Sequence, residues 1–381
     1  MTSVDINLQK LCEELLLTTV EDTEAQGGSV TVMDAGTGEI YAACSYAKKS
    51  DEEREAELAA AEKAAAAAAA ASGQPGDGSL PGDLCDYKLE VGKLAPVTDI
   101  YEPGSTFKAF TAYSVLANND AINPSTTYKV PYALEVFDKV VTDSHDHPYE
   151  DMTITEILAD SSNTGTTLMS REVDLAQLYD TYRAFGIGQK TGCDFPGDAA
   201  GQLADSRDWY GVQSATVTFG QGLTVTPLQL VRAYGVLEQD GILVTPHFLT
   251  DVPNDAEKTE SLMADLTKRE TVADAGVCQE VSEMLTHVVT EGTGEAAAVE
   301  GFAVTGKTGT AEIASAYGGY EENAYVMSFC GWLYGSSSDL VCLVTVNRPH
   351  TMAGAGGLCG PVFSEIMTYA TKRYQIDAQG K

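Results

Sequence analysis

The sequence predicts an α+β fold in which both ends of the chain contribute strands to one sheet. Strand-like segments occur near the N-terminus, at residues 29–46, and return in the last third, at residues 301–349. The region between them, roughly 105–240, is mainly helical in pattern with Gly and Pro breaks. Because strands and helices do not alternate along the chain, we expect a layered α+β arrangement rather than repeated βαβ units.

The N-terminal segments have clear periodicities. Residues 5–20 predict an amphipathic helix that begins after Asp5 as its cap. Its apolar face is formed by Leu8, Leu11, Cys12, Leu15 and Leu16. The next segment, "SVTVMDAGTGEIYAACSY" at 29–46, predicts two strands around a glycine-rich turn.

Residues 48–83 interrupt this pattern. The segment is charged and rich in alanine, and it ends in a Gly/Pro linker. Alanine favours helix, but the segment has too few large apolar side chains to pack against a core. We therefore expect a mobile or loosely helical surface insertion within a domain that otherwise occupies residues 1–381.

The later segments complete the expected fold. Thr153 and Glu156 have the spacing of a capping box, which predicts a helix that ends near "ADSSN" at 159–163. Three apolar segments, 301–314, 324–335 and 339–349, predict strands. A final helix is predicted by the spacing of Val362, Phe363, Ile366, Met367 and Ala370.

Composition excludes several kinds of partner. The chain has 23 Lys and Arg against 56 Asp and Glu, which gives a net charge of -33. Such a surface repels nucleic acid and anionic membranes, and an anionic substrate would need a local cationic pocket.

The eight cysteines show no zinc-ligand spacing, and we expect Cys330 and Cys342 to be small core residues. No metal or other cofactor is expected.

The segment "YEPGSTFK" at 101–108 suggests a nucleophile. Pro103 and Gly104 predict a turn, and Ser105 and Lys108 lie three apart at the start of the following helix. The helix N-terminus favours negative charge on the serine oxygen, while burial would lower the pKa of the lysine. A neutral Lys108 amine beside Ser105 is a competent general base.

Two further motifs occupy suitable positions. In "SSN", Ser161 is placed to pass a proton between Lys108 and a leaving amine, and Asn163 is placed to bind a substrate amide. Taken alone, serine and asparagine are also common at helix ends. The third motif is the strand segment "KTGT" at 307–310.

Each residue of the strand motif has an expected role. We expect Lys307 to hold a substrate carboxylate, and Thr308 and Thr310 to add hydroxyl contacts. Gly309 would leave room for the substrate backbone. The N–H groups of Ser105 and Thr310 would form an oxyanion hole.

Ser-x-x-Lys, Ser-x-Asn and Lys-Thr-Gly occur in this order at a helix start, a helix break and a strand. Second copies of two motifs, at 45–48 and 190–192, lack these contexts. The set resembles the transpeptidase domain of class B penicillin-binding proteins, closest to the septal cell-division type. Further resemblance lies in "VTDIYEPGSTFK", "FGIGQKTGCDFPGDAAG", "FGQGLTVTPLQLVRAYGVLEQDGILVTPH" and "GGLCGPVFSEI".

This resemblance implies a fold and a reaction. The fold is a five-stranded, mostly antiparallel sheet between helical layers. Ser105 would attack the D-Ala-D-Ala end of a peptidoglycan stem peptide and release D-alanine. The amino group of a second stem would then resolve the acyl-enzyme, and β-lactam antibiotics would acylate the same serine.

The resemblance also implies a location and partners. Family members carry an N-terminal transmembrane helix and a pedestal region, and neither is seen in this sequence. We therefore expect residues 1–381 to belong to a longer protein anchored at the extracytoplasmic face of the bacterial cytoplasmic membrane. Divisome membrane proteins would be its partners through the missing N-terminal part.

Two alternatives share the nucleophile. A serine β-lactamase would also use Ser105 and Lys108, but the Glu-x-x-Leu-Asn pattern of class A enzymes is not found between 164 and 300. A β-lactam sensor domain is acylated without turnover, but such domains are usually shorter and lack the "VTPLQL" segment.

The segment "SHDHPYE" contains two histidines, His145 and His147. We expect both to be solvated loop residues rather than metal ligands.

Overall fold

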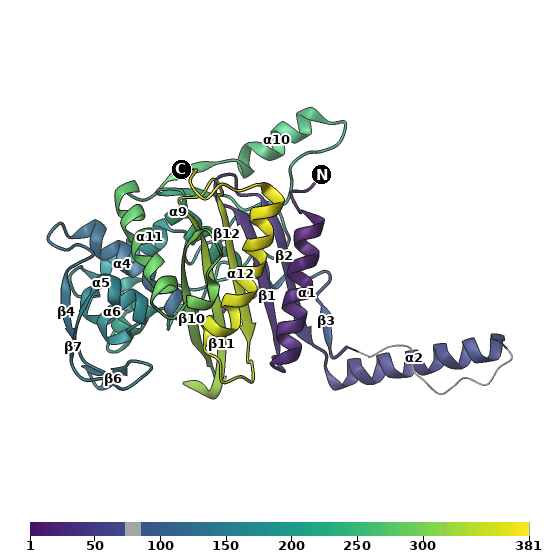
Figure 1. Cartoon of the computed structure of the whole chain (residues 1–381), viewed down its shortest axis with the longest axis horizontal. Helices are drawn as coiled ribbons and strands as arrows, with labels where there is room; N and C mark the ends of the chain where they lie inside the picture. Colours follow the sequence, from purple (N-terminus) through teal and green to yellow (C-terminus); the bar gives the residue numbers. More distant parts are fainter. Residues whose placement is uncertain (73–84, 316, 381) are drawn as a thin grey trace.

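The computed structural model describes residues 1–72, 85–315 and 317–380 and has the α+β architecture that was predicted. A central sheet lies between helical layers (Figure 1). Its strands follow the order β10-β11-β12-β1-β2-β3, and every neighbouring pair is antiparallel. Their bounds are β1 Gly27–Asp34, β2 Ile40–Lys48, β3 Tyr87–Leu89, β10 Ala303–Ala314, β11 Tyr320–Tyr334 and β12 Leu340–Asn347.

The sheet joins the two ends of the chain, as expected. Strand β1 lies between β12 and β2, so that Val30 is opposite both Val344 and Cys44. Five long strands form the expected sheet, and the three-residue β3 adds a short sixth strand at one edge. All eight cysteines are free thiols, and Cys330 and Cys342 are fully buried in the sheet, as predicted.

Helices α1 (Ile6–Asp22) and α12 (Ala355–Tyr374) cover one face of the sheet (Figure 1). The Asp5 side chain caps α1 by accepting hydrogen bonds from the N–H groups of Asn7 and Leu8. The buried faces of both helices pack on the sheet in one apolar cluster that includes Leu16 and Phe363. The predicted amphipathic patterns therefore correspond to real contacts with the core.

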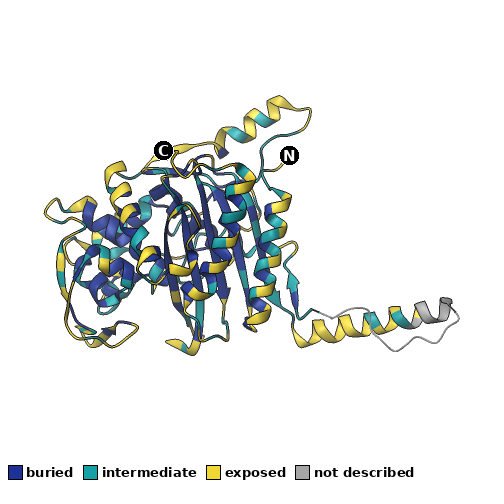
Figure 2. Ribbon diagram, viewed as in Figure 1, coloured by how far each residue is buried: buried dark blue, intermediate teal, exposed yellow. Residues whose placement is uncertain are grey.

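The opposite face holds the larger core. Helices α9 (Pro227–Glu238) and α11 (Ala275–Thr290) pack there, and α4 (Lys108–Asn118) lies beyond them. Edge-to-face aromatic contacts join Phe110 of α4 to Tyr234 of α9, and Tyr234 to Trp332 of the sheet. Figure 2 shows this interior as a continuous buried region. The segment that follows Ser105 is thus anchored in a rigid core.

The remaining helices and 3-10 turns surround this core. They are α3 Ala95–Thr98, α5 Ile154–Asp160, α6 Asn163–Ser170, α7 Leu175–Ala184, α8 Gln213–Thr216 and α10 Ala256–Leu266, with η1 Gly104–Phe107, η2 Ser206–Asp208, η3 Val217–Phe219 and η4 Glu295–Ala297. A short ladder joins β8 (Ile242–Val244) to β9 (Arg269–Thr271).

The expectation of a mainly helical middle region is wrong for residues 127–153. This segment forms two small ladders, β4 (Thr127–Val130) with β7 (Glu150–Thr153), and β5 (Ala133–Val136) with β6 (Lys139–Thr142). The four strands have four residues each and are largely exposed, so they carry too little apolar alternation to be recognised from sequence.

The Ala-rich segment is helical where the structure describes it. Helix α2 (Asp51–Ser72) extends away from the body of the molecule (Figure 1). Its first turns form ion pairs with residues next to β2 and β3, namely Lys88 with Glu53, Lys49 with Glu57, and Arg54 with Asp86. The rest of the predicted insertion, 73–83, lies outside the described residues. Of the helices that are described, none has the length and apolar character needed to cross a membrane.

Candidate active site

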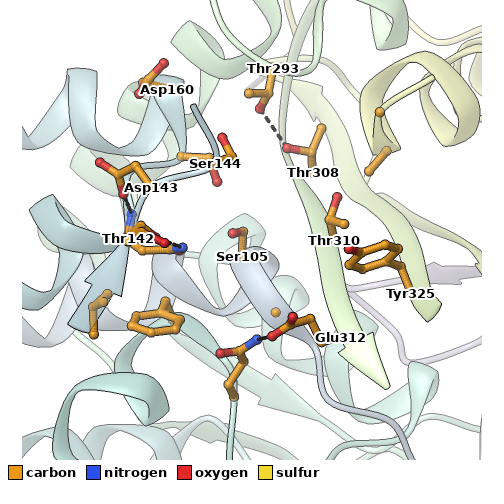
Figure 3. Close-up of a pocket in the computed structure, with 18 of the residues that line it drawn as sticks. Ser105, Thr142, Asp143, Ser144, Asp160, Thr293, Thr308, Thr310, Glu312 and Tyr325 are labelled. Atoms are coloured by element: carbon orange, nitrogen blue, oxygen red, sulfur yellow. Dashed lines mark hydrogen bonds between the residues drawn. The ribbon is translucent and has the colours of Figure 1, made fainter. Parts of the chain in front are cut away.

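A cavity of about 890 Å³ lies beside the edge strand β10 and receives residues from all three sequence motifs (Figure 3). The predicted residues that line it are Ser105, Ser161, Asn163, Thr308 and Thr310. The other three are buried behind its surface: Lys108, Lys307 and Gly309. The structure therefore gathers the predicted residues in one place, although they come from segments up to about two hundred residues apart.

Ser105 lies in the 3-10 turn η1, which leads directly into α4. The prediction that a helix begins near this residue is therefore confirmed. In a 3-10 turn, side chains three residues apart eclipse each other, so Ser105 and Lys108 project to the same side. Gly104 has a φ of +55°, and a Cβ there would lie 3.2 Å from the carbonyl oxygen of Thr310. This close approach holds the Ser105 turn against β10.

Lys108 is fully buried, with an exposed fraction of 0%. Its Nζ donates to the Ser161 carbonyl oxygen and lies 3.3 Å from Ser161 Oγ. Burial lowers the pKa of Lys108 to about 7, against the opposing charges of Asp143 and Asp160. A substantial fraction of the amine is therefore uncharged at neutral pH, as the base role requires.

The predicted direct contact of Lys108 with Ser105 is not formed. Within the described part of the chain, no hydrogen bond joins Lys108 Nζ to Ser105 Oγ, and the amine is directed to Ser161 instead. The Ser161 carbonyl lies at the C-terminal end of α5, where helix carbonyls carry partial negative charge and attract an ammonium donor. Catalytic hydrogen bonds often become short only when substrate is bound.

The helix break at Ser161 is formed as predicted. Helix α5 begins with the capping box of Thr153 and Glu156 and ends at Ser161, which has a left-handed φ of +63°. Ser162 then caps α6, whose first residue is Asn163. The Asn163 amide nitrogen donates to the Thr142 carbonyl at 2.9 Å, which fixes the orientation of the side chain at the cavity wall.

Asp143 is a site residue that the sequence did not reveal. Its buried carboxylate accepts hydrogen bonds from the backbone N–H groups of Asn163 and Thr164 and from the Ser162 hydroxyl. Burial opposes ionisation, but these hydrogen bonds and the Lys108 charge outweigh it and lower the pKa of Asp143. Asp143 thus binds the start of α6 as an ionised group.

The expectation that both loop histidines are solvated is wrong for His147. Its side chain is only 4% exposed, and its Nε2 lies 3.0 Å from an Asp143 oxygen. The side chain of His145 is 57% exposed, as expected. A hydrophilic stretch such as "SHDHPYE" gives no indication of this burial, because the partner of His147 is Asp143, a charged residue that directly precedes the stretch.

Strand β10 presents alternate side chains to the cavity. Thr308, Thr310 and Glu312 line it, while Lys307 points to the other face of the strand and is fully buried. Lys307 Nζ donates to the Thr308 carbonyl and to Thr308 Oγ1, each at 3.3 Å. Burial and the charge of Lys108 lower the pKa of Lys307 well below its usual range. Lys307 therefore acts on the cavity from behind Thr308 rather than as an exposed cation.

Gly309 has close neighbours that were not expected. A Cβ at this position would lie 2.5 Å from Ser328 Oγ, 2.9 Å from Thr106 Cγ2 and 3.0 Å from the Pro103 carbonyl oxygen. A side chain at this position would thus meet β11 and the turn that carries Ser105. Glycine here permits the turn to pack closely on β10.

The cavity surface is acidic. The charged residues that line it in the described part of the chain are Asp143, Asp160 and Glu312, whereas Lys108 and Lys307 lie buried behind it. The expected cationic pocket is therefore not present at the surface.

Thr293 is a further cavity residue that was not predicted from the sequence. It lines the cavity, and its hydroxyl lies 2.7 Å from that of Thr308.

Known proteins are similar to this chain over most of its length. Residues 28–368 match the family "Penicillin binding protein transpeptidase domain". The chain is 32% identical over 369 residues to "Probable peptidoglycan D,D-transpeptidase PenA" of Neisseria flavescens, which covers 96% of this chain and 80% of that protein. It is 28% identical over 382 residues to "Peptidoglycan D,D-transpeptidase FtsI" of Escherichia coli, which covers 98% of this chain and 56% of that protein.

A solved structure is similar over nearly the full length. The TP domain of penicillin-binding protein 3 from Burkholderia pseudomallei has a TM-score of 0.77 and is 26% identical, with 99% of this chain and 97% of that chain covered. The fold and the sequence therefore indicate the same family.

Proposed function

Because this chain belongs to the family of penicillin-binding-protein transpeptidase domains, we propose that it is a peptidoglycan D,D-transpeptidase that works through a Ser105 acyl-enzyme. One observation carries the proposal: the fully buried Lys108, with a pKa near 7, contacts Ser161 at a cavity that is lined by Ser105 and by the edge strand β10. A neutral amine in this position supplies the base that a serine nucleophile needs.

The acylation step follows from this arrangement. The neutral Lys108 amine removes the proton from Ser105 Oγ, which attacks the carbonyl carbon of the penultimate D-alanine. The N–H groups of Ser105 and Thr310 stabilise the negative oxygen of the tetrahedral intermediate. The C–N bond then breaks, and Lys108 returns the proton through Ser161 to the nitrogen of the departing D-alanine.

In the second half of the reaction, the acyl group is transferred to another stem peptide and Ser105 becomes the leaving group. The amino group of another stem peptide attacks the acyl-enzyme, and its proton passes to the neutral amine of Lys108. The ester bond to Ser105 breaks as the new peptide bond forms, and Lys108 returns the proton to Ser105 Oγ. A β-lactam enters the same path at its ring carbonyl and stays bound as a slowly hydrolysed ester.

Substrate binding is assigned to the cavity walls. Asn163 binds a backbone amide of the stem peptide, since its side chain is already oriented by Thr142. The hydroxyls of Thr308 and Thr310 bind the terminal carboxylate, and Lys307 supports Thr308 from behind. Because β10 is an edge strand, its free backbone groups are also available to an extended peptide.

The family also supports the wider assignments. We propose peptidoglycan stem peptides and β-lactams as ligands, with divisome membrane proteins as partners of the full-length protein in cell division. Its place would be the extracytoplasmic face of the bacterial cytoplasmic membrane. The transpeptidase names of the relatives support this function over a β-lactamase or a sensor domain.

The test is the intact mass of the protein after incubation with benzylpenicillin. We expect the mass of one penicillin to be added to the wild-type protein and none to be added to Ser105→Ala. Stable retention of this adduct would distinguish a transpeptidase from a β-lactamase, which releases the hydrolysed drug. Production of cross-linked dimers from a D-Ala-D-Ala stem peptide would separate it from a sensor. A Ser105→Ala protein that still carries the drug would overturn the assignment.

A further inference from the structure

Asp143 forms the centre of a buried hydrogen-bond network at the start of α6. Oδ1 accepts from the N–H of Asn163 and, at 3.0 Å, from the N–H of Thr164. Oδ2 accepts from Ser162 Oγ at 2.7 Å and from Thr164 Oγ1 at 3.0 Å. One carboxylate therefore determines the position of the three residues that follow Ser161.

His147 completes this network. Its Nε2 lies 3.0 Å from Asp143 Oδ2, and its Nδ1 lies 2.7 Å from the Pro148 carbonyl oxygen. A carbonyl oxygen and an ionised carboxylate can only accept hydrogen bonds, so both ring nitrogens must donate. The geometry therefore requires a protonated imidazolium ring. Burial opposes this form, but the hydrogen bonds to Asp143 and Pro148 outweigh it and raise the pKa of His147.

We propose that Asp143 and His147 form a positioning pair for the acyl-transfer site. Ionised Asp143 holds Ser162, Asn163 and Thr164, and thereby the adjoining Ser161, at the cavity wall. Protonated His147 partly offsets the Asp143 charge, so that this charge stabilises the ammonium form of Lys108 less than it would without the histidine. The inference rests on the proposed function, because it assigns a role in the same reaction.

The second proposed role, charge balance at Lys108, follows from the charged groups around that lysine. Asp143 and Asp160 favour the charged form of Lys108, and Lys307 lies nearby as a further amine. His147 faces Asp143, and its other titratable neighbours are Glu150 and the rings of His145 and Tyr132. Without His147, the Asp143 charge would act on Lys108 unopposed and raise its pKa.

A purely structural role predicts a different result. If the pair only stabilised the fold, substitutions would lower the melting temperature without moving the pH dependence of acylation. If the pair also balances charge, the two substitutions have opposite effects. Removal of the Asp143 charge lowers the pKa of Lys108, whereas removal of the His147 charge raises it.

The experiment compares Asp143→Asn, His147→Gln and the control His350→Gln with wild-type protein. His350 is an exposed histidine that pairs with Glu24 and does not line the cavity. Second-order acylation rates with benzylpenicillin are measured between about pH 5.5 and 9, together with thermal unfolding. For Asp143→Asn we expect an acylation rate about 10- to 100-fold lower, since Asn163 and Ser161 lose their position. The midpoint of its pH profile should move to lower pH.

His147→Gln retains a hydrogen-bond donor but no charge. We expect its midpoint to move to higher pH and its rate at pH 7 to fall, while His350→Gln keeps the wild-type rate and midpoint. A His147→Gln protein with wild-type rate and midpoint would overturn the proposal, and so would midpoints that move in the same direction in both variants. If Asp143→Asn does not fold, the acylation rate and pH midpoint of His147→Gln are sufficient to test the proposal. A wild-type protein that is not acylated at all would instead refute the proposed function.

Discussion

Lys108 shows how burial of one residue produces a base. Its side chain is enclosed on α4, and loss of hydration disfavours the ammonium form more than Asp143 and Asp160 favour it. The folded protein therefore holds an amine with a pKa of about 7, although an exposed lysine titrates near 10.4. This single shift is what suits a common residue to the role proposed for it, that of proton acceptor for Ser105.

The first prediction is a pH profile for acylation. Because the neutral amine is the active form, the acylation rate should rise with pH through about 7 and level off above it. Lys108→Arg should lower the rate by at least about 10³-fold, since an arginine side chain stays charged and cannot accept the proton. Stopped-flow measurement with nitrocefin tests both, and a rate that is flat from pH 5.5 to 9 would contradict this base assignment.

A second prediction concerns the backbone at Ser161. Its φ of +63° is a left-handed conformation, which costs a residue with a side chain roughly 1–2 kcal/mol but costs glycine little. Ser161→Ala and Ser161→Gly both remove the hydroxyl near Lys108, so both should be acylated more slowly. Only the glycine variant relieves the strain.

We therefore expect Ser161→Gly to be more stable than Ser161→Ala by about 1 kcal/mol in chemical denaturation. Equal stabilities would mean that the left-handed conformation carries no strain here. Wild-type acylation rates in both variants would exclude Ser161 from proton transfer.

The predicted site residues that the structure brings to one cavity share a local signal. Ser105 and Lys108 lie within one turn, and Ser161 and Asn163 lie at one helix break, so their relation is visible in spacing. Asp143 contacts Asn163 from 20 residues away, and nothing local marks that contact. The contacts around Gly309 were not visible for a similar reason, because the packing of η1 on β10 depends on tertiary structure.

At the level of elements, periodicity predicted the long segments and missed the short ones. Helix α1, the hairpin of β1 and β2, and strands β10 to β12 were all expected, because each has enough residues to show a pattern. The four-residue strands β4 to β7 were not, yet β6 contributes Thr142 to the cavity wall. Short elements gain their structure from pairing partners rather than from their own sequence.

Helix α2 leads to a third prediction. It is joined to the body by ion pairs of Glu53 with Lys88 in β3, of Arg54 with Asp86 beside β3, and of Glu57 with Lys49. Ion pairs near the surface contribute about 0–1 kcal/mol each. Lys49 N–H donates to the Asp86 carbonyl at 2.8 Å, so the two ends of the segment already lie together. A short turn can therefore replace residues 51–84 without moving β2 or β3.

We expect the shortened protein, with Asn-Gly in place of 51–84, to lose no more than about 2 kcal/mol of unfolding free energy. Its acylation rate should stay within about twofold of the wild-type rate, because the cavity lies beside β10 at the opposite edge of the sheet. Denaturation and benzylpenicillin acylation measure the two effects. A tenfold slower rate would show that the segment is part of the working domain rather than an insertion.

At the scale of the whole molecule, charge opposes the proposed reaction. The chain carries a net charge of -33, and the charged residues found at the cavity surface in the described structure are Asp143, Asp160 and Glu312. An anionic stem peptide or penicillin therefore approaches through a repulsive field, and the two buried lysines act on it only at short range. Mobile salt ions screen the long-range repulsion more than the contacts within the cavity.

The last prediction follows from this difference in range. The screening length falls from about 30 Å at 0.01 M salt to about 8 Å at 0.15 M, so the repulsion between the protein and an anionic penicillin should weaken strongly over this interval. We expect the second-order acylation rate with benzylpenicillin to rise by several-fold, whereas ampicillin, a zwitterion with no net charge, should show a much smaller change. Rates that respond equally for the two drugs would mean that the overall field does not limit their approach to Ser105.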